Sequence, residues 1–332
     1  MISYHWCDEL AADDREEVRA LIRRAAAYDA EAGFSAIDES TADSRSSAAE
    51  QVWHLPIRAR RNLSTRVDEP MIIVAYLHLG VDPDGLGLAR FVVDPDYRSR
   101  GIATLLVEEL GLDVTAKDGW AGTGARVVRS WAFGTHPAAE RLTARFAVPA
   151  IRRQWTLVRH LSGPWAAPID PVSTEYTLSE PIESADSHAI VDDVLARTTM
   201  PDRHRLTLSR TTDCGFVVTA TGDHGAVGFV RFDPTHHSHE ELRASWIGAL
   251  LVTDDASGSG LGSALLVRAM AALRESGAQL ALMRIDPDDE RAVRMCRLLS
   301  FEQDEAHACY QVSAADTKDN ICPLLTDAAA RG

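Results

Sequence analysis

A short pattern occurs twice in this chain, and this repeat restricts the possible folds more than any other feature. The two copies are FVVDPDYRSRGIATLL, residues 91–106, and LLVTDDASGSGLGSAL, residues 250–265. Val93 aligns with Val252 and Gly101 with Gly260 without a gap. Each copy has the pattern of an apolar strand, a polar turn and a glycine that precedes an apolar helix. We therefore expect two copies of one folding unit.

The turn between strand and helix has the chemistry of an anion site. The first N–H groups of a helix lack partners within the helix and favour negative charge, and glycine lets a phosphate approach them. Arg98 and Arg100 add positive charge to the first turn, whereas Ser257 and Ser259 offer only hydroxyl groups in the second. The first turn is thus expected to be the stronger phosphate site. A glycine turn of this kind also occurs where close packing alone requires it.

The glycine spacing distinguishes families of phosphate-binding loops. Neither copy has the GxxxxGK[ST] spacing of a Walker loop or the GxGxxG spacing of a Rossmann turn. Residues 98–103, RSRGIA, match [RQ]xxGx[GA], and here the chain resembles the GCN5-related N-acetyltransferases, which hold acetyl-CoA on this turn. Residues 257–262, SGSGLG, keep the glycines but lack the leading Arg or Gln. The resemblance implies an α/β fold with a mixed sheet and two tandem acyl-CoA N-acyltransferase domains.

Composition agrees with two globular domains. The chain has 332 residues, of which 45% are hydrophobic, so each half is large enough to bury its own core. A formal net charge of −15 disfavours nucleic acid and anionic membranes as partners. The longest apolar runs are shorter than a membrane span, and the N-terminus lacks a basic region followed by an apolar core. We therefore expect a cytoplasmic protein, and the resemblance implies a monomer that acts on a small-molecule amine.

Cysteine and histidine give no sign of a metal site. The five cysteines are scattered without a CxxC pair, so neither a disulfide framework nor a zinc site is suggested, and buried thiols are expected. The tract HHSHE, residues 236–240, has no second ligand cluster at a characteristic spacing. A solvated hairpin loop is therefore favoured for this tract, and no metal is expected.

Periodicity predicts a similar order of elements in both halves. The first half has a helix over 14–29 with Val18, Leu21, Ile22 and Ala25 on one stripe, strands at 71–79, 88–93 and 126–132, and a helix from Gly101. The second half has strands at 215–220, 226–232, 245–252 and 279–285, a helix from Gly260 and a helix over 289–299. The proline-rich stretch 161–174 is expected to link domains 1–160 and 175–312, and 313–332 to form a flexible tail.

Two further segments narrow the resemblance to the mycothiol synthase family. Residues 130–161, with SWAFGTHPAAERLTARF and RRQWTLVRHL, are similar to its WAHGxxPAA and REL-x-MRR segments, and residues 282–301 are similar to LYVExDNxxAVxxYxxLGF. The resemblance implies transfer of acetyl from acetyl-CoA to the cysteine amine of cysteinyl-glucosaminyl-inositol, 1D-myo-inositol 2-(L-cysteinylamino)-2-deoxy-α-D-glucopyranoside. This reaction is the last step of mycothiol synthesis in actinobacteria.

Three segments would bind acetyl-CoA according to the same resemblance. The first domain would use Phe91, Val92, Val93, Arg98, Ser99, Arg100, Gly101, Ile102 and Ala103. The second would use Leu250, Leu251, Val252, Ser257, Gly258, Ser259, Gly260, Leu261, Gly262 and Ser263, together with Asp289, Glu290, Arg291, Ala292, Val293 and Arg294 at the start of a helix.

The resemblance also implies that the C-terminal domain performs catalysis, but the chain departs from the family there. The position of the family's general-base glutamate falls near Trp246, and that of its acid tyrosine falls at Cys296. Glu241, or its neighbour Glu240, is a candidate base acting through water, and Cys296 or Tyr310 is a candidate acid for the leaving sulfur. Backbone N–H groups near Leu251 and Val252 would stabilise the oxyanion.

Candidate substrate ligands are Asp38, Asp202 and Arg284. Asp202 lies where the family has a carboxylate, Asp38 aligns with a gap, and Arg284 replaces a family tyrosine. Because these positions control specificity before they control fold, two alternatives remain open. Besides the mycothiol synthase activity, the chain could be a related N-acetyltransferase for another small amine, or a non-catalytic sensor of acetyl-CoA.

Overall fold

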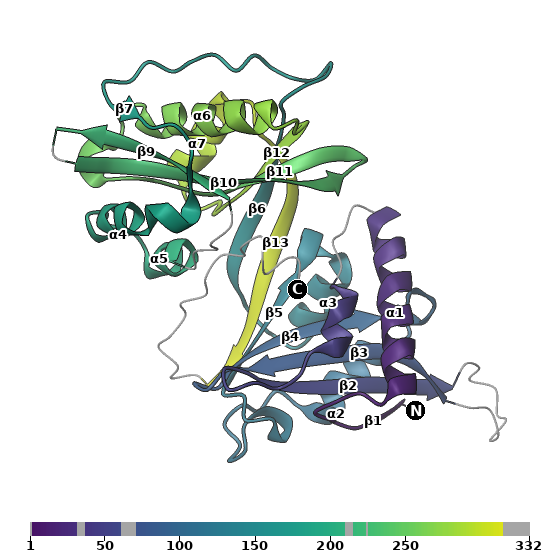
Figure 1. Ribbon diagram of the computed structural model, residues 1–332. Coiled ribbons are helices and arrows are strands. Elements are labelled where there is room, and N and C mark those ends of the chain that lie inside the picture. The colour runs from purple at the N-terminus through teal and green to yellow at the C-terminus, as the bar shows by residue number, and fades with distance from the viewer. Residues whose placement is uncertain (1, 32–36, 61–70, 210–214, 224, 315–332) are drawn as a thin grey trace. The chain divides into compact units, whose positions relative to one another are not determined.

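The computed structural model describes residues 2–31, 37–60, 71–209, 215–223 and 225–314, and the chain divides into two compact units (Figure 1). Unit 1 contains the described residues up to Arg153 and those from His307 onward, and unit 2 contains Gln154–Ala306. The expected domains 1–160 and 175–312 follow the sequence repeat. They differ from these units because residues 154–160 belong to unit 2 and residues from His307 onward belong to unit 1. The expected domains remain a prediction. Most of the expected tail, residues 315–332, lies outside the described residues.

Unit 1 is a sheet with helices on both faces. Its strands are, in order across the sheet, β1 (Ile2–Tyr4), β2 (Gln51–Arg60), β3 (Met71–Val81), β4 (Leu86–Val93), β5 (Val127–Ala132) and residues 308–313 of β13 (Glu302–Ser313). Only the β4–β5 pair is parallel. The helices are α1 (Ala12–Glu31), α2 (Ile102–Leu110) and α3 (Pro137–Arg145), with 3₁₀ turns η1 (Glu39–Asp43), η2 (Pro95–Tyr97), η3 (Trp120–Gly122) and η4 (Phe133–Thr135).

The two faces of this sheet have separate cores. The predicted stripe on α1 is buried, and its members Val18, Leu21 and Ile22 pack with Ile73 and Tyr76 of β3. On the opposite face, Leu106 of α2 packs with alternate residues of the same strand, Leu77 and Leu79. Side chains alternate between faces along a strand, so one strand serves both cores. The expected helix over 14–29 and strands at 71–79 and 88–93 are confirmed.

Unit 2 has the same plan. Its sheet runs β7 (Thr177–Leu178) and β8 (Ile182–Glu183), then β9 (Phe216–Gly222), β10 (Gly225–His239), β11 (Leu242–Val252), β12 (Leu280–Ile285) and residues 155–160 of β6 (Ala150–His160). Only β11 and β12 are parallel neighbours. The helices are α4 (His188–Ala196), α5 (Asp202–Ser209), α6 (Leu261–Glu275) and α7 (Glu290–Leu298), with 3₁₀ turns η5 (Ser184–Ser187) and η6 (Asp254–Ala256).

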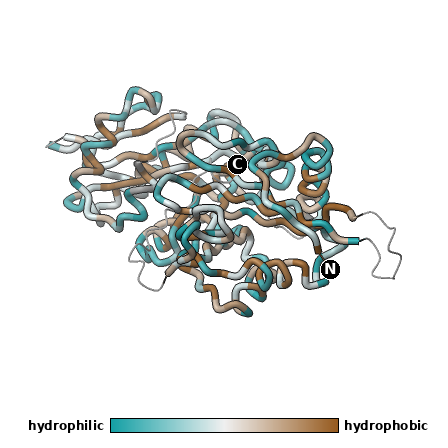
Figure 2. The backbone as a smooth tube through the Cα atoms, turned by 90° about the horizontal axis from the view of Figure 1, so that it is seen from below, coloured by the Kyte–Doolittle hydropathy of each residue, from teal (hydrophilic) through white to brown (hydrophobic). Residues whose placement is uncertain are grey.

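Helices cover both faces of the second sheet as well. Leu265 and Met270 of α6 are fully buried against Val230 of β10 and Ile247 of β11. On the other face, α4 packs against Phe229 of β10. Figure 2 shows hydrophobic and hydrophilic stretches following one another along the backbone. In the described part of the chain, no helix is long and apolar enough to cross a membrane.

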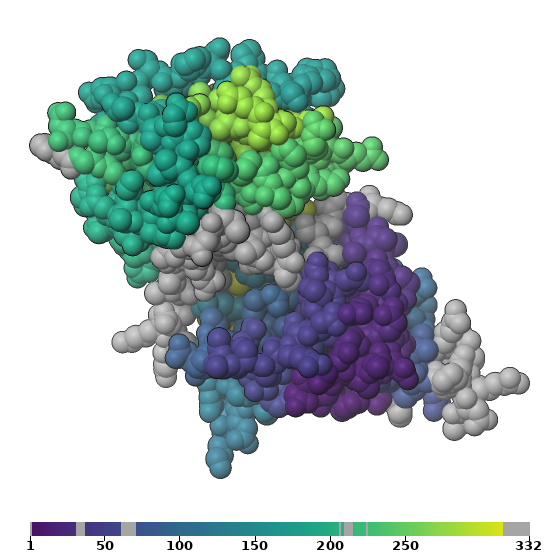
Figure 3. All heavy atoms as spheres, in the orientation of Figure 1, coloured from purple at the N-terminus to yellow at the C-terminus, as the bar shows by residue number. Residues whose placement is uncertain are grey.

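The stretch 161–174 lies on the surface of unit 2, beside α6 (Figures 1 and 3). Arg159 of β6 donates a hydrogen bond of 2.8 Å to the carbonyl oxygen of Pro168, and Ile169 and Val172 pack against the α6-side core. Trp165, in contrast, is 79% exposed. This segment is therefore attached to unit 2 at the buried Leu161 and at its second half, with residues 162–165 exposed between them.

Candidate functional site

In unit 2, the predicted glycine turn joins β11 to α6. Thr253 follows the strand and donates from its N–H and its hydroxyl to the carbonyl oxygen of Val227, at 2.9 and 3.0 Å. Gly258 and Gly260 have φ values of 83° and 85°, in the left-handed region that favours glycine. No atom lies within 4 Å of a Cβ built on Gly260, so the backbone is open at the N-terminus of α6. This arrangement can accept an anion.

Unit 1 repeats this geometry between β4 and α2. Ser99 has a φ of 61°, and Gly101, which caps α2, has a φ of 79° with open space around its Cβ position. Ile102 and Ala103 form the first turn of the helix, while Phe91, Val92 and Val93 end the strand. Both predicted turns are thus strand-to-helix connections with open backbone.

The charge at the two turns differs from the expectation. Both terminal nitrogens of Arg98 donate to the carboxylate of Asp29 in α1, and its Nε donates to Val93 O at 3.2 Å. Arg98 is therefore largely neutralised and holds α1 against the turn. In unit 2, Arg291 of α7 donates to the hydroxyl of Ser257 at 3.2 Å, which brings a guanidinium to the second turn. Arg291 is one of the residues expected at the second acetyl-CoA site, and this contact places it beside the second turn.

Strand pairing ends before the turn in both units. The β11–β12 ladder ends at the pair Ile247–Met283, although β11 continues to Val252. The β4–β5 ladder likewise ends at the pair Ala89–Ser130, although β4 continues to Val93. The last residues of each strand therefore have a backbone edge without a ladder partner on that side. Such an edge pairs readily with an extended ligand that contains amides.

Only the second of these strands is bulged. Arg231 of β10 pairs with Ala249 and the next residue, Phe232, pairs with Ile247, which leaves Gly248 of β11 as an extra residue. The β3–β4 ladder has no such shift from Ala75 to Val81. A bulge leaves one residue unpaired and redirects its backbone groups. Unit 2 therefore has an additional backbone N–H close to the open edge.

The start of α7 lies near the second turn. Asp289 caps this helix and accepts a hydrogen bond of 3.0 Å from the N–H of Ala292. A Cβ built on Gly262 would lie 3.2 Å from the sulfur of Met295, so α7 packs closely on the start of α6. The candidate cofactor residues Glu290, Val293 and Arg294 also line a surface hollow with Pro287, Arg297 and Leu298.

The three candidate catalytic residues belong to different elements. Glu241 lies in the β10–β11 hairpin, ten positions from Leu251, which is roughly 30 Å along a strand. Cys296 is 1% exposed, with its sulfur 3.7 Å from that of Met283, and burial followed by the charge of Asp289 raises its pKa to about 12. Tyr310 belongs to unit 1, where it pairs with Ser130 of β5. Glu241 is thus too remote to act as a base at the turn, because it lies at the opposite end of β11.

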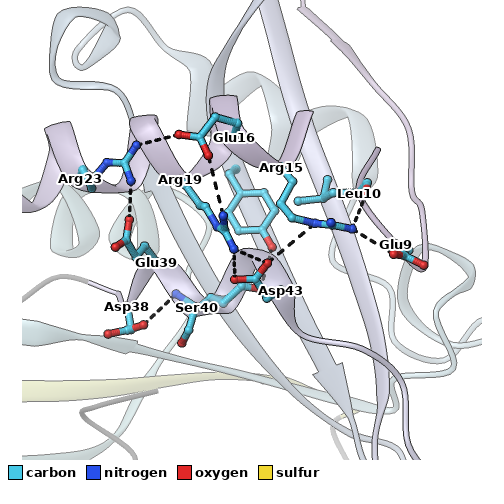
Figure 4. A network of polar contacts seen from close by, with 12 residues as sticks. Glu9, Leu10, Arg15, Glu16, Arg19, Arg23, Asp38, Glu39, Ser40 and Asp43 are labelled. Atoms are coloured by element: carbon cyan, nitrogen blue, oxygen red, sulfur yellow. Dashed lines mark hydrogen bonds and ion pairs between the residues drawn. The ribbon is translucent and has the colours of Figure 1, made fainter. Parts of the chain in front are cut away.

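The candidate substrate ligands also lie apart. Asp38 accepts a hydrogen bond of 2.7 Å from the N–H of Ser40 and caps η1, beside a network of ion pairs that joins η1 to α1 (Figure 4). Asp202 is the exposed first residue of α5. Arg284 of β12 lies over the ring of Trp246, with its Cζ atom 4.5 Å from the centroid. Trp246 and Arg284 therefore form a cation–aromatic pair.

Two residues of unit 2 were not identified from the sequence. Asp286 follows β12 and is buried, and it accepts hydrogen bonds from Arg203 at 3.0 Å and His204 at 3.2 Å, both on α5. Burial alone would raise its pKa, but hydrogen bonds from His204 and the Asp288 N–H, together with Arg203, lower the pKa to about 2. Arg231 of β10 is also buried. An acidic residue directly after a strand was the available signal for Asp286.

In unit 1, the corresponding face of the sheet holds a buried polar cluster. His54, Tyr76 and His78 are fully buried, and His54 Nδ1 lies 2.6 Å from the Tyr76 hydroxyl oxygen. Burial, with smaller contributions from the charges of Arg90 and His54, lowers the pKa of His78 to about 3. This imidazole is therefore neutral near pH 7, and the cluster fills space next to β4.

The histidine tract at the β10–β11 hairpin is part of a strand rather than a loop. His236 to His239 end β10, and His236 contacts the hydroxyl of Ser245 at 3.0 Å and the carbonyl oxygen of Ser276 at 3.1 Å. His239 pairs with Asp304. Among the described residues, no group of three or more His, Cys, Asp and Glu side chains has the arrangement of a metal site.

A family model and several curated proteins match this chain, and all of them are acetyltransferases. The model of the Acetyltransferase (GNAT) family matches residues 38–111 and 182–301, together more than half of the chain. The mycothiol acetyltransferase of Actinosynnema mirum is 26% identical over 323 residues, which cover 93% of this chain and 99% of the relative. That of Sanguibacter keddieii is 28% identical over 306 residues, covering 88% and 91%.

Solved structures agree on the fold. A tandem GNAT protein from the clavulanic acid biosynthesis pathway, solved without AcCoA, has a TM-score of 0.62 at 17% identity and covers 96% of this chain and 100% of its own. A GCN5-related N-acetyltransferase from Sphaerobacter thermophilus has a TM-score of 0.61 at 17% identity, with coverage of 93% and 95%. The expected α/β fold with two tandem N-acyltransferase domains is confirmed.

Proposed function

Because the chain belongs to the Acetyltransferase (GNAT) family and is an acyltransferase, we propose that unit 2 transfers acetyl from acetyl-CoA to the primary amine of a small molecule. The observation that carries the proposal is the open, bulged edge of β11, which leads directly into the glycine turn before α6. The edge is suited to the amide-containing arm of coenzyme A, and the turn is suited to its pyrophosphate.

The open edge also provides the electrostatic part of catalysis. The amine nitrogen attacks the thioester carbonyl, a C–N bond forms, the C–S bond breaks, and the amine proton passes to solvent as the thiolate of coenzyme A leaves. Unpaired backbone N–H groups around Gly248 and Leu251 are the donors available to the oxyanion of the tetrahedral intermediate. Removing one such donor in other enzymes costs about 10²–10³ in kcat.

Strong side-chain acid and base catalysis is not required by this chemistry. An α-amino group has a pKa of roughly 7.7–8.0 and a thiol roughly 8.5, so a useful fraction of the amine is neutral near pH 7 and the thiolate is a good leaving group. Positioning within the site can supply much of the remaining rate. The remoteness of Glu241 and the burial of Cys296 are therefore compatible with turnover.

The first acceptor to test is cysteinyl-glucosaminyl-inositol. The relatives named mycothiol acetyltransferase, which align with nearly the whole chain, support it. A second candidate is a different small amine, and the stacked pair Trp246–Arg284 in unit 2 favours this alternative. The predictions of a monomer, of acetyl as the acyl group and of no nucleic acid or membrane partner stay predictions.

Mass spectrometry of the product tests the proposal. Purified protein is mixed with acetyl-CoA and either cysteinyl-glucosaminyl-inositol, free cysteine or glucosamine, and the acetylated amine is measured. Acetylation of the pseudo-disaccharide alone would support the first acceptor. Acetylation of another amine would support the second candidate, and no acceptor-dependent release of coenzyme A from any amine would contradict amine acetylation by unit 2.

A further inference from the structure

Arg231 is a buried cation that the proposed chemistry leaves unexplained. Its side chain is 8% exposed, and its Nε atom is buried without a hydrogen-bond partner. Among the described residues, no carboxylate forms an ion pair with Arg231. Burial lowers the pKa of the guanidinium, with no acidic group to offset the effect. A buried charge of this kind is costly unless something compensates it.

The surroundings of this guanidinium are apolar. Arg231 pairs with Ala249 of β11 on one side and with Val217 of β9 on the other, and its Cζ atom lies 5.9 Å from the centroid of Phe229. These three neighbours belong to the core between the sheet and α4. The low dielectric of such a site strengthens any charge pair that forms there.

The position of Arg231 connects it to the open edge of β11. Ala249 lies between the bulged Gly248 and the unpaired residues Leu250–Val252, so Arg231 is the cross-strand neighbour of the segment proposed to hold the thioester. The guanidinium is therefore on the strand next to the reacting carbonyl rather than at the phosphate-binding turn, which starts beyond Val252.

Comparison of the two repeats shows that unit 1 arranges its charge differently around the equivalent position. Ala249 of the second repeat aligns with Arg90 of the first, and Arg90 pairs with His78. His78 therefore occupies the equivalent position to Arg231. Because the pKa of His78 is lowered to about 3, unit 1 has a neutral imidazole at this place. The guanidinium of unit 1 is on the neighbouring strand instead, where Arg90 lies 3.5 Å from Nδ1 of His78.

We propose that Arg231 binds a carboxylate of the acceptor, so that the amine acetylated by unit 2 belongs to the class of amino acids. A planar guanidinium matches a carboxylate with two parallel hydrogen bonds, and it compensates the buried charge only when the acceptor is present. This inference rests on acetyl transfer by unit 2. It excludes cysteinyl-glucosaminyl-inositol as the preferred acceptor, because that molecule has no carboxylate to bind Arg231.

Paired acceptors test the proposal directly. Each L-amino acid is compared with its α-carboxamide, with the full-length protein and acetyl-CoA, and kcat/KM is expressed per neutral amine. The wild type is expected to prefer at least one acid over its amide by about 10- to 100-fold, the range for hydrogen bonds to a charged group. In Arg231→Gln this preference should fall to within about threefold, mainly through KM, whereas Arg231→Lys should keep part of it.

The matched control is Arg268→Gln on α6, where an arginine with a partly exposed side chain pairs with Glu180. This variant should retain the wild-type preference. Equal use of acids and amides by the wild type, or an unchanged preference in Arg231→Gln, would overturn the proposal.

A binding measurement keeps the inference separable from the acetyl transfer on which it rests. If no acceptor is acetylated, the thermal midpoint of the protein saturated with coenzyme A is measured with N-acetyl-L-amino acids and with their amides. A shift caused by the acids, absent with the amides and lost in Arg231→Gln, would support the carboxylate site even though acetyl transfer failed. No difference between acids and amides would overturn it.

The unliganded protein provides an independent check. Because an uncompensated buried charge is destabilising, Arg231→Met should not lower the thermal midpoint relative to Arg268→Met. A clear fall would mean that an acid outside the described residues already pairs with the guanidinium, and it would overturn the proposal.

Discussion

Single residues decide whether the second turn can hold a phosphate. Gly260 has open backbone around it and a φ of 85°, and its position caps α6. Asp is favourable at a helix N-cap and tolerates left-handed φ better than most residues, so Gly260→Asp should fold while its carboxylate repels an anion. Asn has nearly the same shape without the charge.

We expect Gly260→Asp to weaken acetyl-CoA binding in unit 2 by more than about tenfold and to abolish turnover, with Gly260→Asn much closer to wild type. Isothermal titration should then show one acetyl-CoA site fewer, and Gly101→Asp should remove the other. Unchanged stoichiometry in both Asp variants would contradict the turn assignment.

Cys296 provides a second test at this scale. Its thiol is buried and its pKa is raised to about 12, so it stays protonated near pH 7 and is shielded from reagents. Cys296→Ala should therefore keep kcat within about threefold, whereas Cys296→Ser buries a hydroxyl and should cost about 1–3 kcal/mol of stability. Kinetics and thermal unfolding measure both effects. A loss of 100-fold or more in a stably folded Cys296→Ala would instead identify the thiol as the acid.

At the scale of elements, Asp286 attaches α5 to the end of β12. Its carboxylate accepts hydrogen bonds from Arg203 and His204, and its folded-state pKa of about 2 lies below the ordinary value of 3.8. A group with a depressed pKa stabilises the fold above its unfolded pKa, and this contribution is lost as pH falls from about 3.8 through about 2. At pH 7 it corresponds to about 2 kcal/mol.

Asp286→Asn should therefore lower the thermal midpoint at pH 7 and reduce the difference in midpoint between pH 5 and pH 2. Asp192→Asn, which changes an exposed acid on α4, is the control and should match wild type at both pH values. Increased hydrogen exchange confined to α5 would locate the effect. An Asp286→Asn variant with the wild-type dependence on pH would contradict the role of this carboxylate.

The whole molecule is built so that each unit contains a strand from the other half of the sequence. Residues 155–160 of β6 pair with β12 in unit 2, and residues 308–313 of β13 pair with β5 in unit 1. A fragment that ends at residue 160 therefore lacks the partner of β5 and exposes a strand edge, which promotes aggregation.

Cleavage near the exposed Trp165 tests this arrangement. With a protease site inserted there, the two fragments of the folded protein should remain together in gel filtration, because each holds a strand of the other's sheet. Fragment 1–160 expressed alone should be aggregated. Two separate, stable and monodisperse fragments would contradict the strand exchange.

Much of the fold could be predicted because its signals are local. The stripe on α1, the alternation along β3 and the glycines before α2 and α6 depend on residues close in sequence, and these elements have the expected bounds within a few residues. The strands β2, β6 and β13 and the helices α3 to α5 were not specified, because their patterns are shorter or mixed with buried polar residues such as His54 and Arg159.

The sequence by itself determined the repeat, the two glycine turns and the order of strand, turn and helix around them, because backbone conformation and amphipathic periodicity are encoded by neighbouring residues. Only the tertiary structure decided which charges meet. It paired Arg98 with Asp29, brought Arg291 to Ser257 and left Arg231 without an acid among the described residues. These outcomes depend on contacts between residues far apart in the chain, and local pattern carries no information about such contacts.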